Sequence, residues 1–240
     1  PGLYFYYFKI GDRTAGCGKL QNLEFSEQIH YYQILIYSEN FSTPDWFKGG
    51  IMYQIFPDRF FRSGDVTLEE GKWLHADWNE KPEYRMNSQG KVLNNDFFGG
   101  NLRGICAKLD YLEKLHVSVI YLNPIFRAYS NHRYDTGDYK KIDPMLGTEE
   151  DFAFLVNECK ARNIRIMLDG VFNHTGDDSL YFNKYGRYDE LGAYQSKDSK
   201  YYAWYNFTEY PNKYDSWWGI DNLPAVNENC PSYNDFITGD

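Results

Sequence analysis

The run IRIMLDGVFNHTG, residues 164–176, joins an apolar segment to a polar one. Residues 164–168 are typical of a strand buried in a sheet. Asp169, Asn173 and His174 follow within six residues. A polar loop after a strand would explain them, but so would the rim of an active site. The polar groups at the end of this strand are therefore the first candidate functional residues.

Two further strands and two helices precede this segment. Residues 51–56 and 117–122 are short apolar runs, each stopped by a proline. Residues 101–116 have helical spacing, and a second helix opens with cap chemistry at residues 148–151. The expected buried positions are Leu102, Ile105, Cys106, Leu109, Leu112 and Leu115 in the first helix, and Phe152, Leu155, Val156 and Cys159 in the second.

The order strand, helix, strand, helix, strand predicts parallel strands buried on both faces. The fold class is therefore α/β, either a doubly wound sheet or a (β/α)8 TIM-type barrel. No glycine-rich phosphate loop follows the first strand, which weakens the nucleotide-binding alternative. Polar clusters at carboxyl strand ends favour the barrel, because barrel active sites lie on that face.

The chain divides into two expected parts. Residues 1–45 carry β-hairpin signals and are read as the tail of an N-terminal β-sandwich-like domain. Residues 46–240 hold only three βα units, so we expect a partial barrel. Its other residues form long insertions at 60–98, 123–147 and 175–229, of which the last is an aromatic-rich loop domain.

Composition narrows the function classes. Net charge is −9 and aromatic content is 19%, with 23 Tyr. The acidic balance excludes a typical nucleic-acid ligand, and no run approaches ~18 apolar residues, so no membrane span is expected. The aromatic residues suit either a packed core or surfaces that bind sugar rings, which have apolar faces and polar edges.

Cysteine usage gives a weak indication of the compartment. The four cysteines lie far apart without metal-ligand spacing, and Cys106 and Cys159 fall on apolar helix faces. Reduced thiols are expected there, which slightly favours a cytoplasmic location. The chain begins without methionine or a basic leader. We therefore expect its N-terminus to be truncated, and the location stays unknown.

Two polar clusters are expected to meet on one rim. The first is residues 132–139 (HRYDTGDY) and the second is residues 169–174. In a barrel, Asp135, Asp169 and His174 would converge beside the ring of Tyr134. These side chains, with His132, could instead bind a metal, although no HxH or HExxH spacing supports that alternative. Packed, hydrogen-bonded loop residues are the third interpretation.

Several segments, in order, resemble the α-amylase superfamily of glycoside hydrolases. The resemblance is to its neopullulanase, cyclomaltodextrinase and maltogenic-amylase branch, and it covers about residues 46–240. The matching segments are MYQIFPDRF (52–60), FFGGNL (97–102), residues 132–139, DGVFNH (169–174), WWG (217–219) and LPAVN (223–227).

The resemblance implies a role for each rim residue. Tyr134 would stack on the sugar before the scissile bond, Asp135 would orient Tyr134 or its polar neighbours, and His174 would hydrogen-bond sugar hydroxyls. Asn173 would brace the rim. Asp169 would support the site by pairing with an arginine. The implied substrates are α-glucans such as starch, maltooligosaccharides, cyclodextrins or pullulan, cleaved with retention.

The resemblance also implies what this chain lacks. A retaining glycosidase uses two carboxylates about 5 Å apart. In this family they follow an Arg-x-Asp motif on later strands. We assign no such motif downstream of His174. Both catalytic carboxylates are therefore expected beyond Asp240, and the chain alone is expected to be inactive. A non-catalytic carbohydrate-binding module and an assembly role remain alternatives.

Two further expectations concern ligands and partners. No cofactor is required, but a calcium ion near Asp65, Gly99 and Asn101 is possible by resemblance. A half-barrel would leave its third strand with an unpaired edge. We therefore expect self-association or a companion segment that carries the later strands.

Overall fold

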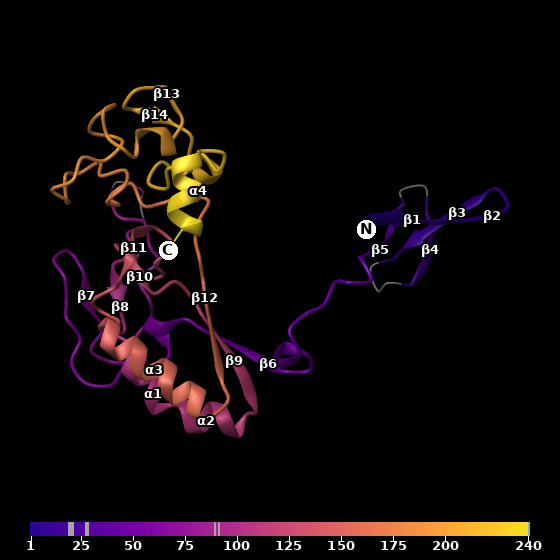
Figure 1. The fold of residues 1–240 in the computed structure, drawn as a ribbon, viewed down its shortest axis with the longest axis horizontal. Helices are drawn as coiled ribbons and strands as arrows, with labels where there is room; N and C mark the ends of the chain where they lie inside the picture. Colours follow the sequence, from indigo (N-terminus) through magenta and orange to yellow (C-terminus); the bar gives the residue numbers. More distant parts are fainter. Residues whose placement is uncertain (19–21, 27–28, 89, 91, 240) are drawn as a thin grey trace. The chain divides into compact units, whose positions relative to one another are not determined.

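The protein is described by a computed structural model that covers all residues except 19–21, 27–28, 89, 91 and 240. It forms two compact units, Pro1–Lys48 and Gly49–Asp240. Figure 1 shows the course of the chain. No helix among the described residues is long and apolar enough to cross a membrane.

The first unit consists of short antiparallel strands, as its hairpin signals predict. β1 (Gly2–Tyr6) pairs with β5 (Tyr32–Ile36), and β3 (Arg13–Cys17) pairs with both β2 (Phe8–Ile10) and β4 (Leu23–Phe25). A turn at Gly11, with φ of +60°, joins β2 to β3. Most apolar side chains of this unit are exposed. The short helical turn η1 (Asp45–Phe47) follows.

The second unit is built on a three-stranded parallel sheet. β6 (Ile51–Ile55), β9 (Val117–Leu122) and β12 (Arg165–Leu168) lie in the order β12-β9-β6. Strands that follow one another along the chain are therefore neighbours in the sheet. That order is typical of a singly wound barrel, whereas a doubly wound sheet reverses its order part-way.

Three helices pack beside this sheet (Figure 1): α1 (Leu102–Ala107), α2 (Leu109–Lys114) and α3 (Glu149–Ala161). The cap predicted for α3 is confirmed, because Thr148 and Asp151 form a reciprocal capping box. The prediction of one continuous helix over residues 101–116 is wrong. The chain breaks at Lys108, whose N–H donates to the Ile105 carbonyl three residues back.

The helices bury one face of the sheet. Two expected core positions are wrong, since Leu115 is 42% and Val156 is 37% exposed at the helix edges. The buried core combines Ile55, Leu102, Ile105, Leu109, Leu112, Val117, Ile120, Leu122, Ile125, Leu146, Leu155, Cys159 and Ile164.

The opposite face of the sheet is covered only at its centre. Val119 is buried in β9, whereas Met52, Gln54 and Arg165 on the outer strands are exposed. The expectation of strands buried on both faces is therefore wrong for β6 and β12. The helices cover one face, and alternate residues of the two edge strands point away from them.

The insertions carry short elements of their own. The short helical turn η2 (Pro57–Arg59) comes just before the first insertion, and the first two insertions contain β7 (Trp73–Leu74), β8 (Asp96–Phe97), β10 (Phe126–Ala128) and β11 (Thr136–Ile142). The region after β12 contains η3 (Tyr202–Trp204), β13 (Phe207–Glu209), β14 (Lys213–Tyr214), η4 (Trp217–Gly219) and α4 (Pro231–Thr238).

The region after β12 has its own aromatic core. Tyr181 and Phe182 are fully buried, and Tyr181 stacks on Trp204 with ring centroids 5.2 Å apart. Helix α4, in yellow in Figure 1, closes this core through Tyr233. Most of the aromatic content of this loop region therefore packs inside it. The buried residues of this aromatic core are Tyr139, Tyr181, Phe182, Ala193, Tyr201, Trp204, Tyr205, Val226, Cys230 and Tyr233.

Candidate functional site

Polar residues follow each strand of the parallel sheet at its carboxyl end. The N–H of Asn123, after β9, donates to Ile55 O at 2.9 Å, and the N–H of Asp169, after β12, donates to Leu122 O at 3.1 Å. The Gln54 amide donates to Asn123 Oδ1 at 2.7 Å. The sheet ladder thus continues into this edge and fixes the position of Asp169.

Tyr134 and Asp169 meet at this edge. The Tyr134 hydroxyl donates to Asp169 Oδ2 at 3.0 Å. Burial, and then the hydrogen bond to Asp169, raise the pKa of Tyr134 to about 12. The pKa of Tyr121 on β9 is raised by burial and by the same carboxylate. Asp169 therefore accepts a hydrogen bond from the Tyr134 hydroxyl, and this bond holds the Tyr134 ring in place.

Asp135 lies beneath the loop rather than on its surface. Its carboxylate accepts from the Ser130 N–H at 3.1 Å and from the Ser130 hydroxyl. The Ser130 hydroxyl lies 3.0 Å from His132 Nδ1, which accepts from the Tyr134 N–H at 3.1 Å. Asp135 thus fixes the turn that presents Tyr134, and burial raises its own pKa.

A buried ion pair under the same loop was missed from the sequence. Arg133, with φ of +62°, is 1% exposed and donates to Asp143 Oδ1 at 3.1 Å and to Asn131 O at 3.0 Å. Asp143 is fully buried, with Lys72 Nζ at 4.0 Å. No spacing rule pairs residues 133 and 143; the one signal was an arginine inside the motif HRYD.

His174 is a buried polar side chain with no well-formed hydrogen bond at either ring nitrogen among the residues that the structure describes. It is 3% exposed, and neither ring nitrogen makes a well-formed hydrogen bond to a described residue, although the Tyr134 backbone lies close enough to act on its pKa. Its ring stacks on Trp217, with centroids 4.9 Å apart. Burial, more than the nearby His132, lowers its pKa, so the imidazole is neutral near pH 7. Buried polar atoms without a well-formed hydrogen bond call for an explanation.

The backbone of the segment that carries His174 is pinned by tyrosines of the loop core. The Tyr139 hydroxyl donates to Val171 O and lies 3.2 Å from His174 O. The Tyr233 hydroxyl donates to Phe172 O at 2.6 Å. Asn173, half-buried, accepts through its carbonyl from the Val226 N–H at 3.0 Å. The aromatic core therefore sets the course of residues 171–174.

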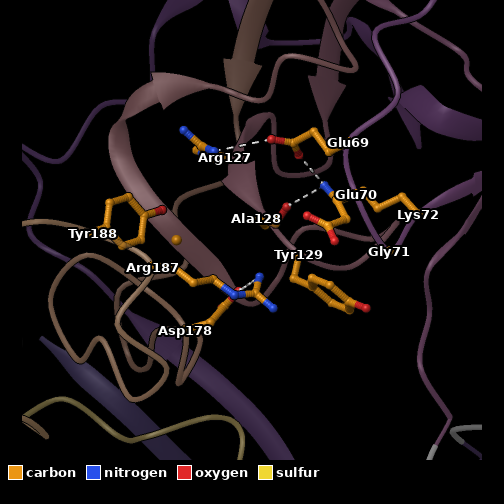
Figure 2. Close-up of a pocket in the computed structure, with 11 residues that line it drawn as sticks. Glu69, Glu70, Gly71, Lys72, Arg127, Ala128, Tyr129, Asp178, Arg187 and Tyr188 are labelled. Atoms are coloured by element: carbon orange, nitrogen blue, oxygen red, sulfur yellow. Dashed lines mark hydrogen bonds and ion pairs between the residues drawn. The ribbon is translucent and has the colours of Figure 1, made fainter.

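A cavity of about 610 Å³ is lined by residues of the first two insertions and of the loop region after β12, among them Lys72, Arg127 and Tyr188. Two of its arginines are paired with carboxylates (Figure 2), since Arg127 donates to Glu69 at 3.2 Å and Arg187 donates to Asp178 at 2.8 Å. Burial, and then the charge of Asp135, raise the pKa of Asp178 to about 6. The cavity does not include Tyr134, Asp169 or His174 in its lining.

The residues suggested for calcium are engaged elsewhere. The Asn101 side-chain oxygen accepts from the Gly104 N–H at 2.7 Å and the Ser63 N–H at 3.3 Å, while the Gly99 N–H donates to Asp58. Asp65 is exposed. The Asn101 oxygen is thus already shared by two backbone donors, and calcium stays an untested prediction. No group of three or more His, Cys, Asp or Glu is placed to hold a metal within the described ranges.

The expected absence of an Arg-x-Asp spacing downstream of His174 is wrong. Residues 187–189 (Arg-Tyr-Asp) do have Arg-x-Asp spacing downstream of His174. They lie in a loop with Arg187 and Asp189 exposed, not at the end of a strand. This occurrence therefore does not supply the strand-end carboxylate that the resemblance calls for.

Comparison with known proteins assigns the family. The description "Alpha amylase, catalytic domain" matches residues 54–233. This chain belongs to the α-amylase family of glycoside hydrolases. An amylopullulanase of Thermoanaerobacterium saccharolyticum is 45% identical over 98% of the chain, and the intracellular maltogenic amylase of Bacillus subtilis strain 168 is 38% identical over 88%. The chain spans 20% and 34% of their respective lengths.

Solved structures agree with this assignment. The type III pullulan hydrolase from Thermococcus kodakarensis aligns over 98% of this chain and 42% of its own, with a TM-score of 0.68 and 27% identity. A cyclic α-maltosyl-(1→6)-maltose hydrolase from Arthrobacter globiformis, in complex with that sugar, aligns over 82% of this chain and 41% of its own, with a TM-score of 0.67 and 35% identity. This chain therefore aligns with part of the α-amylase family fold, a TIM barrel.

The buried pair under the rim gives a stability prediction. Asp143→Ala should lower the free energy of unfolding by about 3–5 kcal/mol, because it leaves the buried Arg133 guanidinium uncompensated. Glu209→Ala, which breaks the exposed Lys213 pair, should change it by less than about 0.5 kcal/mol. Urea denaturation measures both, and equal effects of the two changes would contradict this account.

His132 gives a pH prediction. Burial, and then Arg133, lower its pKa to about 4 from the usual 6.5. Between those pH values the unfolded chain binds more protons, so acid favours unfolding. Relative to a His132→Asn variant, the protein should lose about 3 kcal/mol of unfolding free energy between pH 7 and pH 4. Asp178 titrates in the same range in both proteins and cancels in the comparison. Parallel pH profiles would refute the assignment.

Proposed function

We propose that this chain forms the sugar-binding part of a retaining glycosidase that acts on α-glucans. The names of its relatives refer to amylopullulanase, maltogenic amylase, cyclomaltodextrinase and pullulan hydrolase. They support α-1,4-linked and α-1,6-linked glucans as the substrate class. β6, β9 and β12 would then be the first three strands of a (β/α)8 barrel, with the loop region after β12 as its side wall.

The state of His174 is the observation that carries this proposal. An imidazole with no well-formed hydrogen bond to the described residues at either nitrogen, in a 3% exposed position, would be costly if nothing bound it. A neutral imidazole has one donor and one acceptor, which matches the hydroxyl groups of a sugar. The backbone of Tyr134 and the His132 ring lie beside it, so a ligand there would meet both polar clusters.

The remaining rim residues take roles that match their contacts. Tyr134 offers a ring face held in place by Asp169, which suits stacking on a pyranose. Asp135 and Asn173 position the loop and the rim rather than touch the sugar. Asp169 supports the site, and we propose that the catalytic carboxylate pair comes from barrel strands other than these three.

Sugar binding by the 240-residue chain tests this function. Tyr134→Ala should weaken maltohexaose binding about tenfold in calorimetry, because the stacking face and its hydrogen bond are both lost. Tyr84→Ala, which removes a 68% exposed ring from another insertion, is the matched control and should bind as the wild type does. The same preparation should release no reducing sugar from starch, pullulan or cyclodextrin.

Each other outcome is informative. No measurable affinity of the unaltered chain for glucans would contradict the proposal and favour an assembly role. Robust turnover would contradict the supporting role of Asp169. Affinity without turnover in the longest natural protein that carries this chain would favour a non-catalytic carbohydrate-binding module.

A further inference from the structure

Trp218 is a large apolar side chain whose exposure the fold does not explain. Its ring is 83% exposed, more than any other large hydrophobic residue that the structure describes. Its backbone is left-handed, with φ of +53°, a conformation that is uncommon for residues other than glycine. Non-glycine residues keep such a conformation only where their surroundings enforce it, and they cluster at ligand sites.

The segment around Trp218 is held firmly against the rim. The Trp217 N–H donates to Leu223 O at 2.9 Å, and the Ile220 N–H donates to Trp217 O at 3.0 Å. Residues further along this loop continue the attachment, because His174 pairs with Ala225 and the Thr175 N–H donates to Pro224 O at 3.1 Å. The exposed ring thus belongs to the same rigid unit as His174.

The ring of Trp218 is the outer layer of a stack that begins inside the site. His174 stacks on Trp217 at 4.9 Å and 25°, and Trp217 stacks on Trp218 at 4.2 Å and 12°. One face of Trp218 is covered by Trp217, and the other is open. The stack therefore leads from the buried imidazole to an open, flat apolar face.

We propose that Trp218 is a sugar platform for a glucose unit of the glucan chain beyond the unit that contacts His174. The proposal rests on the proposed function and adds a subsite to it. A pyranose ring presents a flat row of C–H groups, which fits one indole face while its hydroxyls stay in water. A single ring is far smaller than the roughly 1,000 Å² that a stable protein interface buries, so a sugar suits it better than a second copy.

Chain length is the property that this subsite would control. A maltose molecule bound at His174 and Tyr134 would not depend on Trp218, whereas a longer oligosaccharide would reach it. Trp218→Ala should therefore weaken maltohexaose binding about tenfold and change maltose binding by less than about twofold. Trp218→Tyr keeps a flat ring and should restore most of the maltohexaose affinity.

Oxidation of the unaltered protein tests the same contact without a substitution. In the longest natural protein that carries this chain, N-bromosuccinimide should oxidise Trp218 rapidly, as followed by peptide mass spectrometry. Saturating maltohexaose should slow that oxidation several-fold. Oxidation of Trp78, which is 40% exposed in another insertion, should not change.

The outcomes separate this inference from the proposed function. If maltohexaose does not bind the unaltered protein, the proposed function fails and the subsite fails with it. If maltohexaose binds but Trp218 is neither protected nor needed, only the subsite is overturned. If Trp218 is protected from oxidation without sugar, and more so at higher protein concentration, the subsite is also overturned. The ring then belongs to a contact between copies.

Discussion

The arrangement of the rim depends on the hydroxyl of Tyr139. This group donates to Val171 O and lies 3.2 Å from His174 O, so it spans the segment that leads from β12 to His174. Burial raises the pKa of Tyr139 far above its usual value, which keeps the donor proton in place at any physiological pH. Tyr233 adds a second hydroxyl at Phe172 O. A loop of polar residues thereby acquires a fixed backbone.

Two separate cores hold the rim in place. The aliphatic core under α1–α3 positions the sheet edge and, through it, Asp169. The aromatic core of the loop region positions His174, on which Trp217 stacks. The buried Arg133–Asp143 pair supports the turn that carries Tyr134. Three separate supports therefore meet at Tyr134, Asp169 and His174, and together they preorganise a rim made of loops.

Local patterns in the sequence predicted the local parts of this structure. The parallel strands, the Thr148–Asp151 cap and the polar strand ends follow from periodicity and cap chemistry, which act over a few residues. The break at Lys108 was not predictable from spacing alone, because residues 101–116 keep an apolar stripe across it. The exposure of Met52 and Arg165 depends on what covers a sheet face, which periodicity does not record.

The candidate site shows the same limit. The motifs named Tyr134, Asp169 and His174, and the structure brings Tyr134 against Asp169 with His174 beside the Tyr134 backbone. The Arg133–Asp143 ion pair was missed because it depends on a left-handed turn at residue 133. The hydroxyl of Tyr139 meets carbonyls that are 32 and 35 residues away. Long-range contacts of this kind follow from the fold and leave no local pattern.

The affinity of a Tyr139→Phe variant for maltohexaose tests the central claim most directly. The substitution keeps the ring in the aromatic core and removes only the hydroxyl that holds the rim. The matched control is Tyr201→Phe, which removes a hydroxyl from the same core where it contacts Glu190. We predict several-fold weaker binding for Tyr139→Phe and a change below about twofold for Tyr201→Phe. Wild-type affinity in a folded Tyr139→Phe protein would contradict the account.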